Sequence, residues 1–217
     1  MSDPWSERAD AYRSSVTHAT DADLDIVAEL CEPAVGRTAL DVATGGGHVA
    51  RRLREEGMNV VTSDPAPGMQ ADVICSAESI PFADGSFDVV VSRIAPHHFA
   101  DIESAVAEMS RVARHAVVIE DTLFTSESVE RAEKLRDPTH VRSYSEAEWR
   151  GLLEGAGLSV DRVEHFTKTH DLEDWLARTG CVGEEAAQVR GLLAEVSSED
   201  GATWQDVKII LRGRKAA

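Results

Sequence analysis

Three histidines and the polar residues near them are the side chains best suited to acid–base chemistry. His97 and His98 are adjacent, and His140 shares a later segment with Arg142 and Tyr144. A histidine titrates near neutrality and can take a proton from a hydroxyl, an amine or a carbon acid. We therefore predict that His97, His98 or His140 acts as a catalytic base, and that Arg142 and Tyr144 bind the substrate.

Asp121, which ends an apolar run, is expected to orient either a substrate or a histidine. Purely structural roles stay open for these residues. Of His97 and His98, one can cap a helix and the other can pack beneath that helix. Arg142 can pair with a carboxylate in an exposed turn. Trp149 and Trp175 are expected to anchor their helices, and His170 is expected at the surface or at a strand edge. The acids at 120–121 are the only adjacent acidic pair that follows a predicted strand, so no metal site is expected.

A glycine-rich turn has the composition of a nucleotide-binding loop. Asp41 lies in an apolar run that leads into Gly45 and Gly47, and a helical segment follows. Glycines let the backbone approach a ligand, and a helix N-terminus offers unpaired N–H groups to it. Asp64 ends the next apolar run, where a carboxylate can hold ribose hydroxyls. The pattern predicts an adenosine-containing ligand. The third glycine of a dinucleotide turn and the lysine of an ATP-binding loop are both missing.

Short apolar runs alternate with helical segments along the whole chain. Strands are expected at 38–42, 58–63, 71–76, 87–92, 115–121, 158–166 and 204–213. Helices are expected from a cap at Thr20, and at 48–57, 102–114, 126–136, 145–157, 172–179 and 184–196. Such alternation is typical of a parallel sheet covered on both faces, and ligands bind beyond the carboxyl ends of its strands. We therefore expect one α/β domain over residues 1–217, with the candidate residues gathered at one edge of the sheet.

The composition limits the partners. A net charge of −17, from 39 acidic and 22 basic residues, repels nucleic acids and anionic membranes, so neither is expected as a partner. The charged N-terminal sequence has no apolar signal segment, and three scattered cysteines form no CxxC pair, so a cytoplasmic protein is expected. We expect a small-molecule substrate and a monomer or homodimer.

Several longer motifs resemble the class I S-adenosylmethionine-dependent methyltransferases. ALDVATGGGH, SDPAPGM and AESIPFADGSFDVVVS are similar to successive motifs of the methyltransferase type 11 family, which includes ubiquinone- and menaquinone-biosynthesis C-methyltransferases. ADAYRSSVTHA, RIAPHHFAD, RDPTHVRSYSEAEW and DWLARTG are similar to a narrower subgroup whose substrates are largely unassigned. The resemblance extends from Ala9 to about Arg212.

The resemblance implies a fold, a reaction and a cofactor site. It implies a Rossmann-like seven-stranded sheet of order 3-2-1-4-5-7-6 with strand 7 antiparallel and helices on both faces. Residues 1–19 would form an N-terminal lid, and residues 167–200 a helical insertion between strands 6 and 7. The reaction would transfer a methyl group from S-adenosylmethionine to an oxygen, nitrogen or carbon of a small molecule and release S-adenosylhomocysteine. The implied cofactor-binding residues are Tyr12, Asp41, Ala43, Thr44, Gly45, Gly47, His48, Asp64, Pro65, Ser76, Ala77, Glu78, Ser92 and Arg93.

The chain departs from the family pattern at four places, one of which is Ala113-Arg114-His115 in place of the usual Pro-Gly-Gly turn before strand five. Ala43 replaces the first glycine of the turn, and Ser76 replaces an aspartate that commonly contacts the adenine amine. The connection at 65–71 is too short for more than one turn of the usual second helix. Two other functions stay open, namely a non-catalytic module that binds the cofactor or its product, and a non-methylating reaction on the same scaffold.

Overall fold

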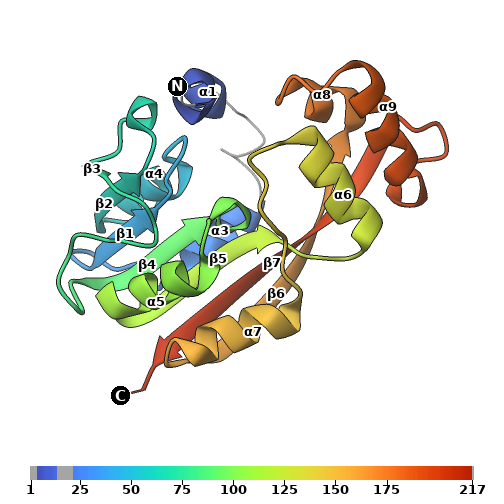
Figure 1. Ribbon diagram of the computed structural model, residues 1–217. Coiled ribbons are helices and arrows are strands. Elements are labelled where there is room, and N and C mark those ends of the chain that lie inside the picture. Colours follow the sequence, from blue (N-terminus) through green and yellow to red (C-terminus); the bar gives the residue numbers. More distant parts are fainter. Residues whose placement is uncertain (1–3, 14–21, 217) are drawn as a thin grey trace.

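The computed structural model describes residues 4–13 and 22–216 of the chain (Figure 1). Thr20 and residues 1–3 and 14–19 of the expected lid lie outside the described residues, as does the side chain of Tyr12. A seven-stranded sheet of order β3-β2-β1-β4-β5-β7-β6 forms the centre of the molecule, which confirms the predicted order. Its strands are β1 (Thr38–Val42), β2 (Asn59–Asp64), β3 (Val73–Ile74), β4 (Phe87–Arg93), β5 (Ala113–Thr122), β6 (Leu158–Asp171) and β7 (Thr203–Lys215).

The described helices fall close to their predicted positions. They are α1 (Pro4–Arg13), α3 (Ala22–Leu30), α4 (His48–Glu55), α5 (Ile102–Val112), α6 (Glu127–Arg136), α7 (Glu146–Gly155), α8 (Leu172–Ala177) and α9 (Gly183–Leu192), with 3-10 turns η1 (Pro67–Met69), η2 (Pro96–His98) and η3 (Ala194–Val196). At the start of α7, Ser145 and Glu148 form a reciprocal capping box, which satisfies two otherwise unpaired backbone N–H groups. None of the helices in the described part of the chain is both long enough and apolar enough to cross a membrane.

The direction of each strand follows from its connection. β1, β2, β3, β4 and β5 run parallel, because each is reached through a crossover, whereas β7 is antiparallel to both β5 and β6. This confirms that the seventh strand is antiparallel. Because the parallel strands point the same way, their carboxyl ends meet at one edge of the sheet.

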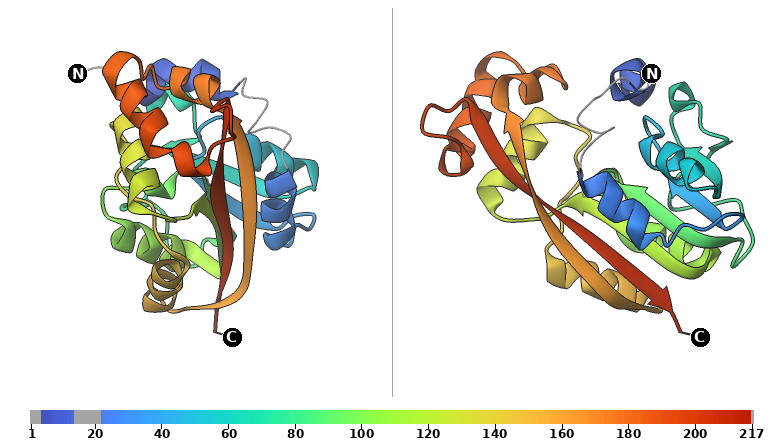
Figure 2. Two further views of the ribbon diagram at one scale, coloured as in Figure 1. Left: turned by 90° about the vertical axis from the view of Figure 1, so that its right-hand side faces the viewer. Right: turned by 180° about the vertical axis from the view of Figure 1, so that it is seen from behind.

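Helices cover both faces of the sheet, and a third group of helices lies beyond it. α5 and α7 pack on one face around Met109 and Trp149, while α3 and α4 pack on the other around Val27 and Leu53. α6, α8 and α9 gather around Trp204 at the far end of the long β6–β7 hairpin, on the same side of the molecule as α1 (Figures 1 and 2). The edge of the sheet therefore has α1 and this helical group above it.

Two strands differ most in length from their predictions. β3 has only two residues. It is joined to β2 by a single 3-10 turn and two short loops. β6 continues to Asp171 instead of ending at 166, because it stays paired with β7 as far as Thr203. The expected insertion at 167–200 is therefore corrected: its helices begin at Leu172.

Candidate active site

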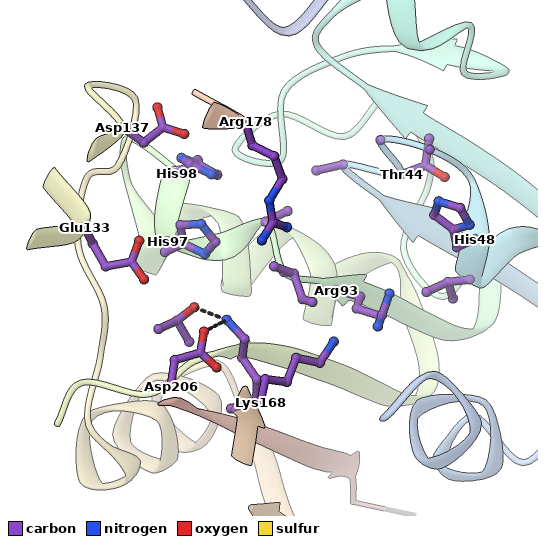
Figure 3. Close-up of a pocket in the computed structure, with 18 of the residues that line it drawn as sticks. Thr44, His48, Arg93, His97, His98, Glu133, Asp137, Lys168, Arg178 and Asp206 are labelled. Atoms are coloured by element: carbon purple, nitrogen blue, oxygen red, sulfur yellow. Dashed lines mark hydrogen bonds and ion pairs between the residues drawn. The ribbon is translucent and has the colours of Figure 1, made fainter. Parts of the chain in front are cut away.

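A cavity of about 540 Å³ lies at the carboxyl ends of the parallel strands, within the usual size range of small-molecule sites. One half is formed by the turns after β1, β2 and β4, and the other half by α6, α8 and the β6–β7 hairpin (Figure 3). Ten of the predicted site residues line it, and these are Asp41, Ala43, Thr44, Gly45, His48, Asp64, Pro65, Arg93, His97 and His98.

The glycine turn is held in shape by Asp41. Its buried carboxylate accepts hydrogen bonds from Thr44 Oγ1 at 2.6 Å and from the Ala50 backbone N–H at 3.2 Å. Burial raises the pKa of Asp41 to about 6. Ala43 and Gly45 both have positive φ angles, and a Cβ at Gly45 would meet nothing within 4 Å, so the turn leaves open space beside its backbone.

Asp64 connects the turns after β1 and β2. Its Oδ2 accepts a hydrogen bond from the Gly45 N–H at 3.0 Å, and its Oδ1 accepts one from the Ala66 N–H at 2.9 Å. Each carboxylate oxygen can accept two hydrogen bonds, so these contacts orient the group without exhausting its capacity. The carboxylate is thereby fixed in the wall of the cavity.

His97 and Asp121 form the acid–base pair of the cavity. His97 Nδ1–H donates to Asp121 Oδ1 at 2.5 Å, which leaves Nε2 as the acceptor on the ring. His97 lines the cavity, whereas Asp121 is fully buried behind it. Burial lowers the pKa of His97 well below its usual value and raises the pKa of Asp121 to about 7. The imidazole is therefore neutral at pH 7 and able to accept a proton.

His98 connects the cavity wall to the N-terminal helix. Its Nδ1 donates to the Thr139 carbonyl at 3.0 Å, and burial lowers its pKa to about 3. The Trp5 ring on α1 meets the His98 ring edge-on at 4.6 Å between centroids. α1 also contacts η1, where Ser6 Oγ accepts a hydrogen bond from the Gly68 N–H at 2.8 Å. α1 thus closes one side of the cavity.

We expect Gly68→Ala to detach α1. A Cβ at Gly68 would lie 2.5 Å from the Ser6 Cα, too close for any atom, whereas the Gly68 backbone itself tolerates alanine. Amide hydrogen exchange in residues 4–13 is expected to become faster, and to respond less to S-adenosylhomocysteine than in the unchanged protein. Gly151→Ala on α7, where a Cβ meets nothing within 4 Å, is the control. Unchanged protection of α1 in Gly68→Ala would contradict the docking described above.

The segment after α6 does return to His97, and its Asp137 lines the cavity, but His140, Arg142 and Tyr144 lie outside the cavity lining. The His97 carbonyl accepts hydrogen bonds from the backbone N–H groups of Val141 and Arg142. His140 is buried behind His97, 5.2 Å away between ring centroids, and its Nε2 meets Glu130 at 3.2 Å. This places His140 in the supporting layer and not among the residues that line the cavity.

Arg142 and Tyr144 are also placed away from the cavity. The Arg142 guanidinium is half exposed and pairs with Glu148, as the structural alternative expected. The Tyr144 ring is buried against Trp149, 5.3 Å away between centroids. In this structure neither side chain has the placement needed for the predicted substrate contact.

Five predicted cofactor-binding residues also lie outside the cavity lining, namely Gly47, Ser76, Ala77, Glu78 and Ser92. Glu78 accepts a hydrogen bond from the Ala100 N–H at 3.0 Å, Ser92 Oγ donates to the Val42 carbonyl at 2.9 Å, and Ala77 packs in the core. Tyr12 belongs to α1, but its side chain is outside the described part of the chain. The cofactor roles of these residues therefore stay predictions.

The half of the cavity opposite the glycine turn was not predicted from the sequence. Its lining residues are Glu133, Arg136, Phe166, Thr167, Lys168, Thr169, His170, Trp175, Arg178, Asp206 and Lys208. His170 lies on the edge strand β6, one of the two places expected for it, and it also lines the cavity. Trp175, besides packing in the helical group, also faces the cavity. One signal was available, because three of the four lysines in the chain lie on β6 and β7.

A buried ion network underlies the middle of the cavity. Arg93 pairs with Asp23 at 2.7 Å and with Glu120 at 2.6 Å, and Lys168 also reaches Asp23 at 2.7 Å. Burial raises the pKa of Glu120 to about 8. The network joins α3, β4, β5 and β6 beneath the cavity, so it holds the two halves of the site in register.

The sheet order, the glycine turn after β1 and the acid after β2 together define the class I methyltransferase fold. The family described as "Methyltransferase domain" matches residues 40–119. YcgJ of Bacillus subtilis, an uncharacterized methyltransferase, is 28% identical over 93% of this chain and 88% of its own length. Demethylmenaquinone methyltransferase from Beutenbergia cavernae is 34% identical over 36% of this chain and 37% of its own.

A solved structure agrees with these relatives. The crystal structure of a putative methyltransferase, BH2331 from Bacillus halodurans, matches this structure with a TM-score of 0.80 and 27% sequence identity. The match covers 91% of this chain and 100% of the BH2331 chain. These similarities confirm the class predicted from the sequence motifs. The chain thus carries a methyltransferase domain on the class I methyltransferase fold.

Proposed function

We propose that the enzyme transfers the methyl group of S-adenosylmethionine to a small-molecule acceptor bound in the cavity described above. The observation that carries this proposal is that the glycine turn, Asp64 and His97 line one and the same cavity. A cofactor at the turn and an acceptor beside His97 share an enclosed space, where alignment and exclusion of water favour the transfer.

The residues of the turn fit the cofactor. The open space at Gly45 admits a ligand against the backbone, and the N-terminus of α4 offers its dipole and N–H groups to the carboxylate of the methionine part. In this proposal Thr44, Gly45 and His48 hold the methionine part, and Asp64 holds the ribose hydroxyls. When bound, S-adenosylmethionine supplies an electrophilic methyl group, and the chain supplies orientation and a proton acceptor.

His97 Nε2 is the atom that takes up the proton lost by the acceptor. Asp121 fixes the ring orientation through Nδ1–H and stabilises the imidazolium that forms. Deprotonation makes an oxygen, nitrogen or carbon acceptor more nucleophilic without a metal ion or a second cofactor.

The acid–base pair predicts a pH dependence. Burial raises the pKa of Asp121 to about 7 and lowers that of His97, so above pH 7 the pair holds a neutral base and an ionised acid. As the pH falls through 7 the pair takes up one proton, and His97 no longer accepts another. We expect kcat/KM to be level above pH 7 and to fall about tenfold per pH unit below it. A rate that is level between pH 5 and 8 would contradict this role.

A small molecule is the substrate class we propose. The cavity is closed by α1 on one side and by the helical group on the other, and the net charge of −17 disfavours nucleic acids and anionic membranes as partners. A monomer or homodimer in the cytoplasm remains our expectation.

The test combines binding with methyl accounting. Thermal unfolding is measured with S-adenosylmethionine, S-adenosylhomocysteine, NAD and ATP, and we expect only the first two to stabilise the protein. The protein is then incubated with a small-molecule extract and S-adenosylmethionine labelled in its methyl group, and new labelled products are sought by mass spectrometry. Stabilisation without labelled product would indicate a binding module, and a new product without the label would indicate a non-methylating reaction.

A further inference from the structure

Glu133 is a carboxylate on the cavity wall whose hydrogen-bonding capacity is unused. Its side chain is only 8% exposed, and its nearest charged partner is Arg136, whose Nη1 lies 3.8 Å away, beyond hydrogen-bond distance. Within the described part of the chain, no hydrogen bond to its carboxyl group is present. Figure 3 shows the group directed into the cavity on the wall that also carries His97 and His98.

Each of the other carboxylates that line this cavity has at least one hydrogen bond or short ion pair within the protein, although Asp206 Oδ1 has no hydrogen-bond partner among the described residues. Asp41 and Asp64 accept backbone N–H groups, Asp137 accepts Thr139 N–H and Oγ1–H, and Asp206 pairs with Lys208 at 2.8 Å. A buried carboxyl group without hydrogen bonds costs folding free energy, and burial raises the pKa of Glu133 for the same reason. The ion pair to Arg136 at 3.8 Å is too long to supply the missing hydrogen bond.

The helix holds Glu133 firmly in position. On α6, Val129 and Ala132 pack against the cluster that includes Trp175, which sets the rotation of the helix. Glu130, three residues earlier, is also a glutamate of low exposure, but it meets His140, the Ser143 N–H and Lys134. The two glutamates therefore differ, since Glu130 Oε2 accepts hydrogen bonds within the protein whereas Glu133 lines the cavity.

We infer that Glu133 binds a hydroxyl group of the methyl acceptor and so selects hydroxylated small molecules; this inference rests on the proposed function. The carboxyl group accepts a hydrogen bond from the hydroxyl group. This contact fixes the methyl acceptor in the half of the cavity formed by α6 and the β6–β7 hairpin. An ammonium group fits this half less well, because Arg136 and Lys208 both act electrostatically on Glu133 and would repel it.

The first test needs no ligand and compares Glu133→Leu with the matched variant Glu130→Leu in the full chain. Glu133→Leu removes an unsatisfied carboxyl group, so its Tm is expected to be unchanged or raised by about 2–4 °C. Glu130→Leu breaks the contacts to His140 and Ser143, so its Tm is expected to fall. A fall of the same size in both variants would show that Glu133 is structural and would overturn the inference.

The second test measures selectivity in the presence of S-adenosylhomocysteine. The probes are hydroxylated aromatic acids, each compared by calorimetry with the same acid lacking its hydroxyl group. The unchanged protein is expected to bind the hydroxylated member of a pair about 10- to 100-fold more tightly, and Glu133→Leu is expected to lose that difference. A preference that survives in Glu133→Leu would overturn the inference.

The two proposals fail in different ways. Hydroxyl selectivity that depends on Glu133, with no labelled methyl group in any product, would remove the proposed function and leave the binding role. Methyl transfer that is unaffected by Glu133→Leu would remove the binding role alone.

Discussion

Replacing His97 by asparagine is expected to lower the rate of methyl transfer by about 10²- to 10⁴-fold, the usual contribution of a positioned base. Asparagine keeps a polar side chain near Asp121 but has no nitrogen that takes up a proton at neutral pH. Asp121→Asn is expected to lower the rate as well, because its amide favours the other imidazole tautomer and no longer stabilises the imidazolium.

The measurement is kcat and KM for the acceptor, followed through formation of the labelled product, together with the affinity of the enzyme for S-adenosylhomocysteine. The affinity is expected to change little, since neither His97 nor Asp121 belongs to the turns after β1 and β2. His115→Asn, at an exposed histidine on β5, is the matched control and should keep full activity. A His97→Asn enzyme with an unchanged kcat would show that the reaction depends on alignment of cofactor and acceptor alone.

Replacing Asp64 by alanine is expected to remove most of the stabilisation that the cofactor gives. In the unchanged protein, S-adenosylhomocysteine at 100 times its Kd should add about 2.7 kcal/mol, which raises the Tm of a chain of this size by about 5–11 °C. Asp64→Ala removes the proposed ribose acceptor and also the contact that orients the Gly45 N–H. The Tm shift on adding the ligand is therefore expected to fall to near zero.

The control for this loss is Asp72→Ala. Asp72 also accepts two hydrogen bonds at the end of the sheet, from the Thr62 N–H at 2.9 Å and the Thr62 Oγ1–H at 2.8 Å, but it does not line the cavity. The Asp72→Ala variant should have a lower Tm without ligand, and its Tm shift on adding S-adenosylhomocysteine should equal that of the unchanged protein. Equal ligand shifts in both variants would contradict the role assigned to Asp64.

The strands and the glycine turn could be predicted because both depend on local patterns, whereas the order of the strands was implied by the family resemblance. Apolar runs, the capping box at Ser145 and the glycine turn each act over a few neighbouring residues. Parallel strands then place the residues after β1, β2 and β4 at one edge, so Asp41, Asp64 and His97 meet without further information.

The acceptor half could not be predicted in the same way. Glu133 and Lys208 lie far apart in the chain, and they share one cavity only because β7 returns antiparallel along β5 and β6. The sequence also suggested a substrate contact for Arg142 and Tyr144, but a pairing with Glu148 and packing against Trp149 turn these side chains elsewhere.

Local sequence thus determined which elements form, where the sheet ends and which residues stand at the glycine turn, since propensity, periodicity and capping are properties of neighbouring residues. The tertiary structure alone decided that His97 and His98 line the cavity, that His140 lies behind His97, and that Glu133 is the glutamate of α6 that faces the cavity. Those outcomes depend on long-range packing of α6, the β6–β7 hairpin and the segment after α6 around His97, and no short stretch of the chain encodes them.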